Sequence, residues 1–91
     1  MSKIKEDELN DLYDSFIKIK DREACKEFLS DLLTSQELEA LTSRLHAAKL
    51  LINGETYQQV INKTNISSAT LARVSKCVKN GKGYNSILKD K

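Results

Sequence analysis

The sequence predicts an all-α protein of about six helices. No segment alternates apolar and polar residues in the manner of a β-strand, whereas apolar residues recur at spacings of three and four. Helix caps and Asn-Gly pairs separate these periodic segments, and the chain contains no proline. The 91 residues contain no internal repeat and no long linker, which predicts a single domain over residues 1–91.

Two apolar stripes predict the first two helices. The stripe of the first helix, expected from Glu6 to about Lys20, consists of Leu9, Leu12, Tyr13, Phe16 and Ile17. The stripe of the second helix, expected to start near Asp21, consists of Cys25, Phe28, Leu29, Leu32 and Leu33. Both stripes are wider than the core of one small monomer requires.

The third helix is predicted from a capping box and a long stripe. Thr34 and Glu37 have the spacing of a capping box, in which each side chain bonds the other residue's backbone amide. The stripe that follows consists of Leu38, Leu41, Leu45, Ala48 and Ile52. Asn53-Gly54 is expected to end this helix, because both residue types tolerate a left-handed conformation.

Three shorter helices are predicted after this stop. Thr56-Tyr57-Gln58-Gln59 is a second capping box, and it opens a helix that ends near Lys63-Thr64. Asn65 is expected to make a left-handed turn, Ile66 to enter the core and Ser67 to cap a helix that runs to about Lys79. The apolar face of that helix is expected to consist of Leu71, Val74 and Val78. Asn80-Gly81 then ends that helix, and the apolar residues Tyr84, Ile87 and Leu88 predict a last short helix within residues 81–91.

The segment from Thr56 to Arg73 has the spacing of a helix-turn-helix. In such a motif the start of the second helix enters the major groove of DNA, so small residues are needed there. Hydroxyl and methyl groups can contact base edges, while basic and amide side chains can contact phosphates or bases. The candidate DNA-binding residues are Gln58, Gln59, Ser67, Ser68, Ala69, Thr70, Ala72, Arg73 and Lys76.

The net charge of +2 conceals a strong asymmetry. Residues 1–39 carry six Lys or Arg and eleven Asp or Glu, whereas residues 40–91 carry nine and two. No acidic residue lies between Thr56 and Gly83, which contains five of these basic residues. A basic segment over a candidate helix-turn-helix favours double-stranded DNA as the partner.

Other function classes find less support. The alternative that stays open is a helical protein-interaction module that binds an acidic partner through the same basic face. The sequence shows no catalytic or phosphate-binding motif, so we do not expect an enzyme. One His and two Cys are too few for a zinc site, so no metal is expected. The lack of a long apolar run and of a signal-like N-terminus predicts a cytoplasmic protein without a membrane partner.

Several short motifs together resemble the tryptophan repressor family, and in particular a short related branch for which no ligand is defined. The motifs are Leu33-Thr34-x-x-Glu37-x-Glu39-Ala40-Leu41-x-x-Arg44, then Leu50-Leu51-x-x-Gly54-Glu55, then Ala69-Thr70-x-x-Arg73. The resemblance lacks one residue in the turn near Asn65. It implies an intertwined homodimer that represses transcription from a near-palindromic operator. It also implies that residues 1–33 form a dimerisation region and residues 34–80 a DNA-binding region.

The resemblance further implies a ligand pocket. In the repressor, two arginines enclose the indole of bound tryptophan, and the matching residues here are Arg44 and Arg73. Thr34 and Thr70 match pocket threonines. Val74 stands where the repressor has a glycine close to the ligand, so its side chain would fill that space. A small-molecule corepressor is therefore compatible with the pattern, L-tryptophan is disfavoured, and no cofactor is expected to be required.

Overall fold

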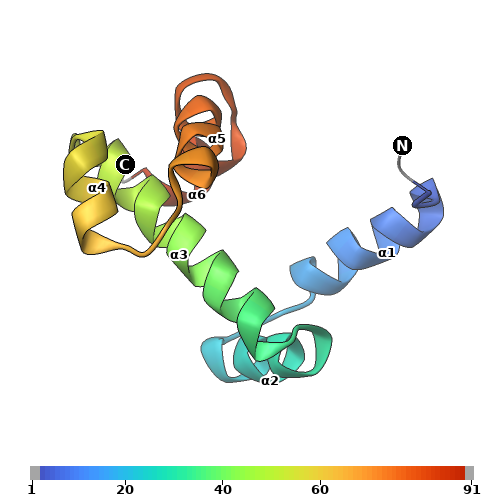
Figure 1. Cartoon of the computed structure of the whole chain (residues 1–91). Helices are drawn as coiled ribbons and strands as arrows, with labels where there is room; N and C mark the ends of the chain where they lie inside the picture. Colours follow the sequence, from blue (N-terminus) through green and yellow to red (C-terminus); the bar gives the residue numbers. More distant parts are fainter. Residues whose placement is uncertain (1–2, 90–91) are drawn as a thin grey trace. The chain divides into compact units, whose positions relative to one another are not determined.

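The computed structural model describes residues 3–89, and within this range the chain is helical and has no strand (Figure 1). Its helices are α1 (Glu6–Ile17), α2 (Arg22–Leu32), α3 (Ser35–Ile52), α4 (Tyr57–Lys63), α5 (Ser68–Asn80) and α6 (Gly83–Leu88). The prediction of an all-α chain with about six helices is confirmed. None of the helices in this range combines the length and the apolar character needed to cross a membrane.

The chain forms two compact units, which we describe separately. The N-terminal unit comprises residues 1–35 and contains α1 and α2. The C-terminal unit comprises residues 36–91 and contains α4, α5, α6 and all but the first residue of α3. The assignment of the whole chain to a single domain stays a prediction.

In the N-terminal unit, α1 is shorter than predicted. It starts at Glu6 as expected, but it ends at Ile17 instead of Lys20. The reason lies in the cap of α2: Asp21 is extended, and its carboxylate accepts a hydrogen bond of 2.8 Å from the Ala24 amide. A residue that caps the next helix cannot continue the previous one, so the chain leaves α1 before it.

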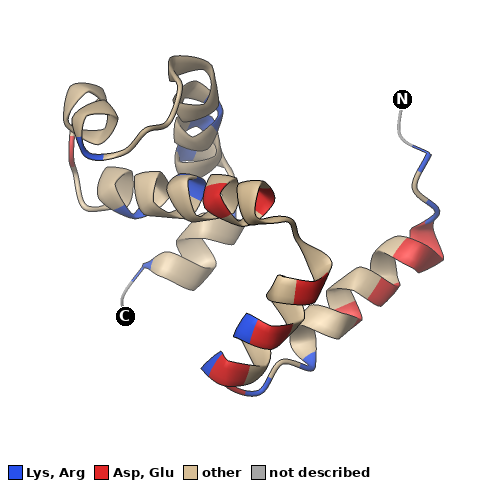
Figure 2. Cartoon of the chain, turned by 60° about the horizontal axis from the view of Figure 1, so that its bottom comes forward, with Lys and Arg blue, Asp and Glu red and all other residues tan. Residues whose placement is uncertain are grey.

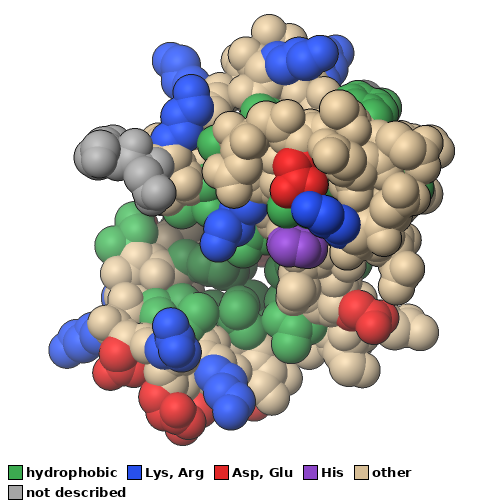
Figure 3. Space-filling model, turned by 90° about the vertical axis from the view of Figure 1, so that its left-hand side faces the viewer, with side chains coloured by type: hydrophobic (Ala, Val, Ile, Leu, Met, Phe, Trp, Pro, Cys, Tyr) green, Lys and Arg blue, Asp and Glu red, His purple; other side chains and the backbone are tan. Residues whose placement is uncertain are grey.

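The apolar stripes of α1 and α2 remain largely open in this unit. The rings of Phe16 and Phe28 meet edge to face with centroids 5.7 Å apart. Neither helix contains a buried residue, and Ile17 is 78% and Tyr13 53% exposed. Hydrophobic side chains are also uncovered on the face of the molecule in Figure 3. Covering exposed apolar surface of this kind with a second surface would stabilise the protein.

The C-terminal unit has a small apolar core to which α3, α4, α5 and the turn between α4 and α5 contribute. Its buried members are Ala47, Ala48, Val60, Ile66, Leu71 and Val74. Partly buried side chains pack around them, and these are Leu50, Leu51, Ile61, Val78, Tyr84 and Leu88. The predicted burial of Ile66 is confirmed, as is the inward face of α5.

Gly54 ends α3 in the way the sequence predicts. Its φ is +94°, and the Gly54 amide donates to the Leu51 carbonyl at 3.0 Å. The Glu55 amide donates to the Leu50 carbonyl at 3.1 Å, which completes a Schellman motif. Two carbonyls of the last helical turn thereby find partners, and the chain turns toward α4.

We predict that Gly54→Ala destabilises the fold by about 1–2 kcal/mol, because a β-carbon is strained in the left-handed region. No atom lies within 4 Å of the position a Gly54 β-carbon would take, so the cost comes from the backbone alone. Urea unfolding measures the effect. Gly83→Ala is the matched control: it has the same open surroundings without a left-handed φ, and we expect no loss of stability. Equal effects of the two substitutions would contradict this account.

Candidate nucleic-acid interface

The fourth helix is held at its start by a complete capping box. The Gln59 amide donates to the Thr56 hydroxyl at 3.2 Å, and the Thr56 amide donates to the Gln59 side-chain oxygen at 2.8 Å. The Gln58 side-chain amide donates to Asn62 at 3.1 Å. Gln58 and Gln59 are exposed, as a DNA-contacting role requires, but both also support α4 itself.

The turn between α4 and α5 differs from the prediction. Gly54 is the one residue with a positive φ in the described part of the chain, so the left-handed Asn65 that we predicted is wrong. The turn instead starts from Thr64, which is extended at φ −130° and ψ 171°, and reaches Ser67 at φ −75° and ψ 158°. Ile66 lies between them and is 9% exposed. Extended residues and a buried anchor reverse the chain here, so no left-handed residue is needed.

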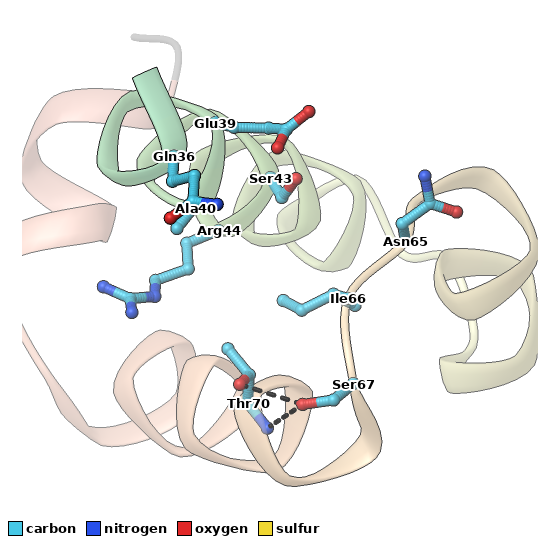
Figure 4. Close-up of a pocket in the computed structure, with 9 residues that line it drawn as sticks. All are labelled: Gln36, Glu39, Ala40, Ser43, Arg44, Asn65, Ile66, Ser67 and Thr70. Atoms are coloured by element: carbon cyan, nitrogen blue, oxygen red, sulfur yellow. Dashed lines mark hydrogen bonds between the residues drawn. The ribbon is translucent and has the colours of Figure 1, made fainter. Parts of the chain in front are cut away.

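The start of α5 is fixed by two hydroxyl side chains. Ser67 accepts a hydrogen bond of 3.2 Å from the Thr70 amide, and its hydroxyl donates to the Thr70 hydroxyl at 3.0 Å (Figure 4). The cap that we predicted at Ser67 is confirmed. Ser68 and Ala69 follow with exposed side chains. The helix therefore starts with small groups that do not block the approach of another molecule.

One side of α5 is buried, and other parts of its surface are exposed to solvent. Leu71, Val74 and Ser75 are buried against the core. Ala72, Arg73 and Lys76 are exposed on other sides of the helix. Asn80, which the sequence analysis did not single out, is also exposed, and it follows Lys76 by four residues. Positions 69, 73, 76 and 80 are separated by four, three and four residues, so they lie on one face of the helix. The sequence already contained this spacing.

The positive charge of the C-terminal unit is concentrated on α5 and its end. Lys63 lies 2.8 Å from the Glu55 carboxylate, so a nearby acid compensates its charge. Arg73, Lys76, Lys79 and Lys82 are exposed. Figure 2 shows basic positions on α5 and acidic positions along α1, α2 and the start of α3. The charge asymmetry of the sequence thus becomes a basic face on α5.

Three of the four candidate ligand-binding residues line one pocket of about 400 Å³ in the C-terminal unit. Arg44 comes from α3, whereas Thr70 and Arg73 come from α5. Val74 also lines this pocket, although it is 2% exposed. The fourth candidate, Thr34, belongs to the N-terminal unit. The remaining lining residues are Ala69, Cys77 and Tyr84.

Arg44 and Thr70 also line a second, more polar pocket of about 360 Å³ between α3 and the turn (Figure 4). Arg44 extends from α3 toward α5 in this view. The other lining residues are Gln36, Glu39, Ala40, Ser43, Asn65, Ile66 and Ser67. The structure brings Arg44, Thr70 and the cap of α5 together, which sequence spacing alone does not reveal.

Within residues 3–89, no group of three or more His, Cys, Asp or Glu side chains is placed to hold a metal ion. The single histidine, His46, is exposed on α3, and it is visible on the surface in Figure 3.

We predict that Ser67→Ala destabilises the protein by about 1 kcal/mol, because it removes the cap of α5. Ser68→Ala is the control, since this neighbouring serine is exposed and does not cap the helix; its effect should stay within about 0.5 kcal/mol. Urea unfolding of both variants measures the difference. A Ser67 variant as stable as the Ser68 variant would show that the cap contributes nothing.

Comparisons with known proteins place the chain in a family. Residues 7–91 match the model of the Trp repressor protein family. The chain is 37% identical over 81 residues to the uncharacterized protein YerC of Bacillus subtilis (strain 168), and this match covers 89% of our chain and 78% of YerC. A Staphylococcus aureus protein provisionally named a Trp repressor has a crystal structure that matches with a TM-score of 0.85 and 33% identity, covering 92% of our chain and 85% of that one. The chain therefore belongs to the Trp repressor family, whose members are regulatory DNA-binding proteins.

Proposed function

We propose that this protein is a sequence-specific DNA-binding transcriptional regulator that acts as a repressor. The observation that carries the proposal is the open start of α5, where Ser68 and Ala69 are exposed directly beside the cations of the same helix. The cap at Ser67 and the buried Ile66 hold this end of the helix rigidly. A preorganised helix end with small side chains suits entry into the major groove.

Different residues of α5 contact different parts of the DNA. Ser68, Ala69 and Thr70 lie in the first turn, where hydroxyl and methyl groups contact base edges and thymine methyls. Arg73 and Lys76 lie farther along the exposed side and contact phosphates or guanines. Gln58 and Gln59, in the first turn of α4, contact a backbone phosphate or a base.

The protein acts as an intertwined homodimer in this proposal. The open apolar stripes of α1 and α2 support it, because a second copy would cover surface that one chain leaves exposed. A two-fold dimer presents two α5 helices, so the operator is near-palindromic, with half-sites about one helical turn apart. In this proposal the protein acts in the cytoplasm.

The pocket beside α5 offers a place for a small effector, although DNA binding requires none in this proposal. Arg44 and Arg73 both line it and favour an anionic group. Val74 occupies part of its wall with a β-branched side chain. We therefore expect the pocket to exclude L-tryptophan and to take a different small effector or none.

Selection from a pool of random duplexes tests the function directly. The full-length protein should enrich one motif with two-fold symmetry, because each subunit reads the same half-site. Salt-sensitive binding without any enriched motif would refute sequence-specific regulation. That result would favour a helical interaction module with an acidic partner.

We predict that Lys76→Ala weakens binding to all duplexes and reduces the slope of log K against log salt by about one unit, because one phosphate contact is lost. Lys63→Ala is the matched control, since the Lys63 ammonium pairs with Glu55 and should leave the slope unchanged. Titrations at several salt concentrations give both slopes. An unchanged slope for Lys76→Ala would remove this residue from the interface.

We predict that titration calorimetry detects no binding of L-tryptophan to the wild-type protein, because Val74 fills space that the indole needs. A thermal shift measured with and without the amino acid is the second readout, since a bound ligand stabilises the folded state. Measurable heat together with a raised melting temperature would contradict the exclusion.

A further inference from the structure

The turn between α4 and α5 is built without glycine, and one hydroxyl holds it together. Residues 64–67 contain no glycine, and none of them has a positive φ. A chain that reverses direction must still find partners for its backbone groups, especially where these are partly buried. The side chain of Thr64 forms hydrogen bonds with two of these backbone groups.

Thr64 bridges the end of α4 and the buried anchor of the turn. Its hydroxyl donates to the Val60 carbonyl at 2.9 Å and accepts from the Ile66 amide at 3.3 Å. Both bonds are partly buried. Val60 is fully buried and Ile66 is 9% exposed, so the hydroxyl links the backbones of two core residues. The Thr64 amide also donates to the Val60 carbonyl at 2.9 Å.

This link acts directly on the orientation of α5. Ile66 is followed at once by Ser67, the cap of α5, and then by the exposed Ser68. A shift of the Ile66 backbone would therefore move the start of the helix and the groups that meet base edges. Contacts from Arg73 and Lys76 to phosphates tolerate such a shift better, since charge attraction depends weakly on direction.

We propose that Thr64 is a positioning residue for sequence recognition, an inference that rests on the proposed function. Its hydroxyl takes the place of a left-handed glycine in the turn, and it holds α5 at the angle at which Ser68 and Ala69 read bases. Thr64 does not itself contact DNA. Its loss should lower discrimination between sequences more than it lowers general affinity for DNA.

Thr64→Val tests the proposal because valine keeps the shape of threonine and lacks the hydroxyl. We expect affinity for the enriched duplex to fall about fivefold to tenfold, the loss that one or two hydrogen bonds predict. Affinity for an unrelated duplex should change less than about twofold, since phosphate contacts dominate it. Thr64→Ser keeps the hydroxyl and should restore discrimination.

Two further measurements separate positioning from a general loss of structure. Amide hydrogen exchange should show faster exchange at Ile66 in Thr64→Val and wild-type exchange in Thr64→Ser. Thr42→Val is the matched control, because the Thr42 hydroxyl donates to the Leu38 carbonyl at 2.8 Å, within α3 and outside the turn. This control should leave both affinities unchanged.

Clear outcomes would overturn the proposal. Equal losses on both duplexes, unchanged affinity for the enriched duplex, or a Thr64→Ser variant that behaves like Thr64→Val would each remove the role of Thr64. If selection yields an enriched duplex and Thr64→Val binds it as tightly as the wild-type protein does, the positioning role of Thr64 is refuted and the proposed function stands. The absence of any enriched duplex refutes the proposed function, and this role falls with it.

Discussion

The burial of Ile66 is the constraint on which the arrangement of the C-terminal unit depends. Ile66 joins Val60 of α4 and Leu71 of α5 in one cluster with two alanines of α3. Because the cluster is small, each member contributes a large share of the packing, and a misplaced turn would open it. The turn, the angle of α5 and the exposure of its first residues all follow from this one anchored side chain.

Hydroxyl groups in this region serve two purposes, and burial and backbone position separate them. Thr56, Thr64 and Ser67 use their hydroxyls to satisfy backbone groups at helix ends and in the turn. Ser68, one residue beyond the cap, is exposed and remains available to a partner. The same chemistry therefore builds the scaffold at one position and presents a surface at the next, because an N-cap hydroxyl points back at its own helix.

Much of the fold could be predicted because its signals are local. The cap at Ser67, the capping box at Thr56 and the left-handed Gly54 each depend on a few neighbouring residues, and the structure confirms them. Asn65 shows where local reasoning fails: its residue type favours a left-handed turn, but the anchoring of Ile66 and the bonds of Thr64 make an extended path more favourable. Propensity is a weak preference that such contacts override.

The sequence by itself determined the number and order of the helices, the caps of α4 and α5, the split of charge and the inward face of α5, since periodicity and capping act within a few residues. Only the tertiary structure decided that Arg44 of α3 shares a pocket with Ser67, the cap of α5, and that Lys63 pairs with Glu55. It also decided that one hydroxyl ties the turn to the core. These features arise when separate helices pack against each other, and neither spacing nor composition specifies which side chains then meet.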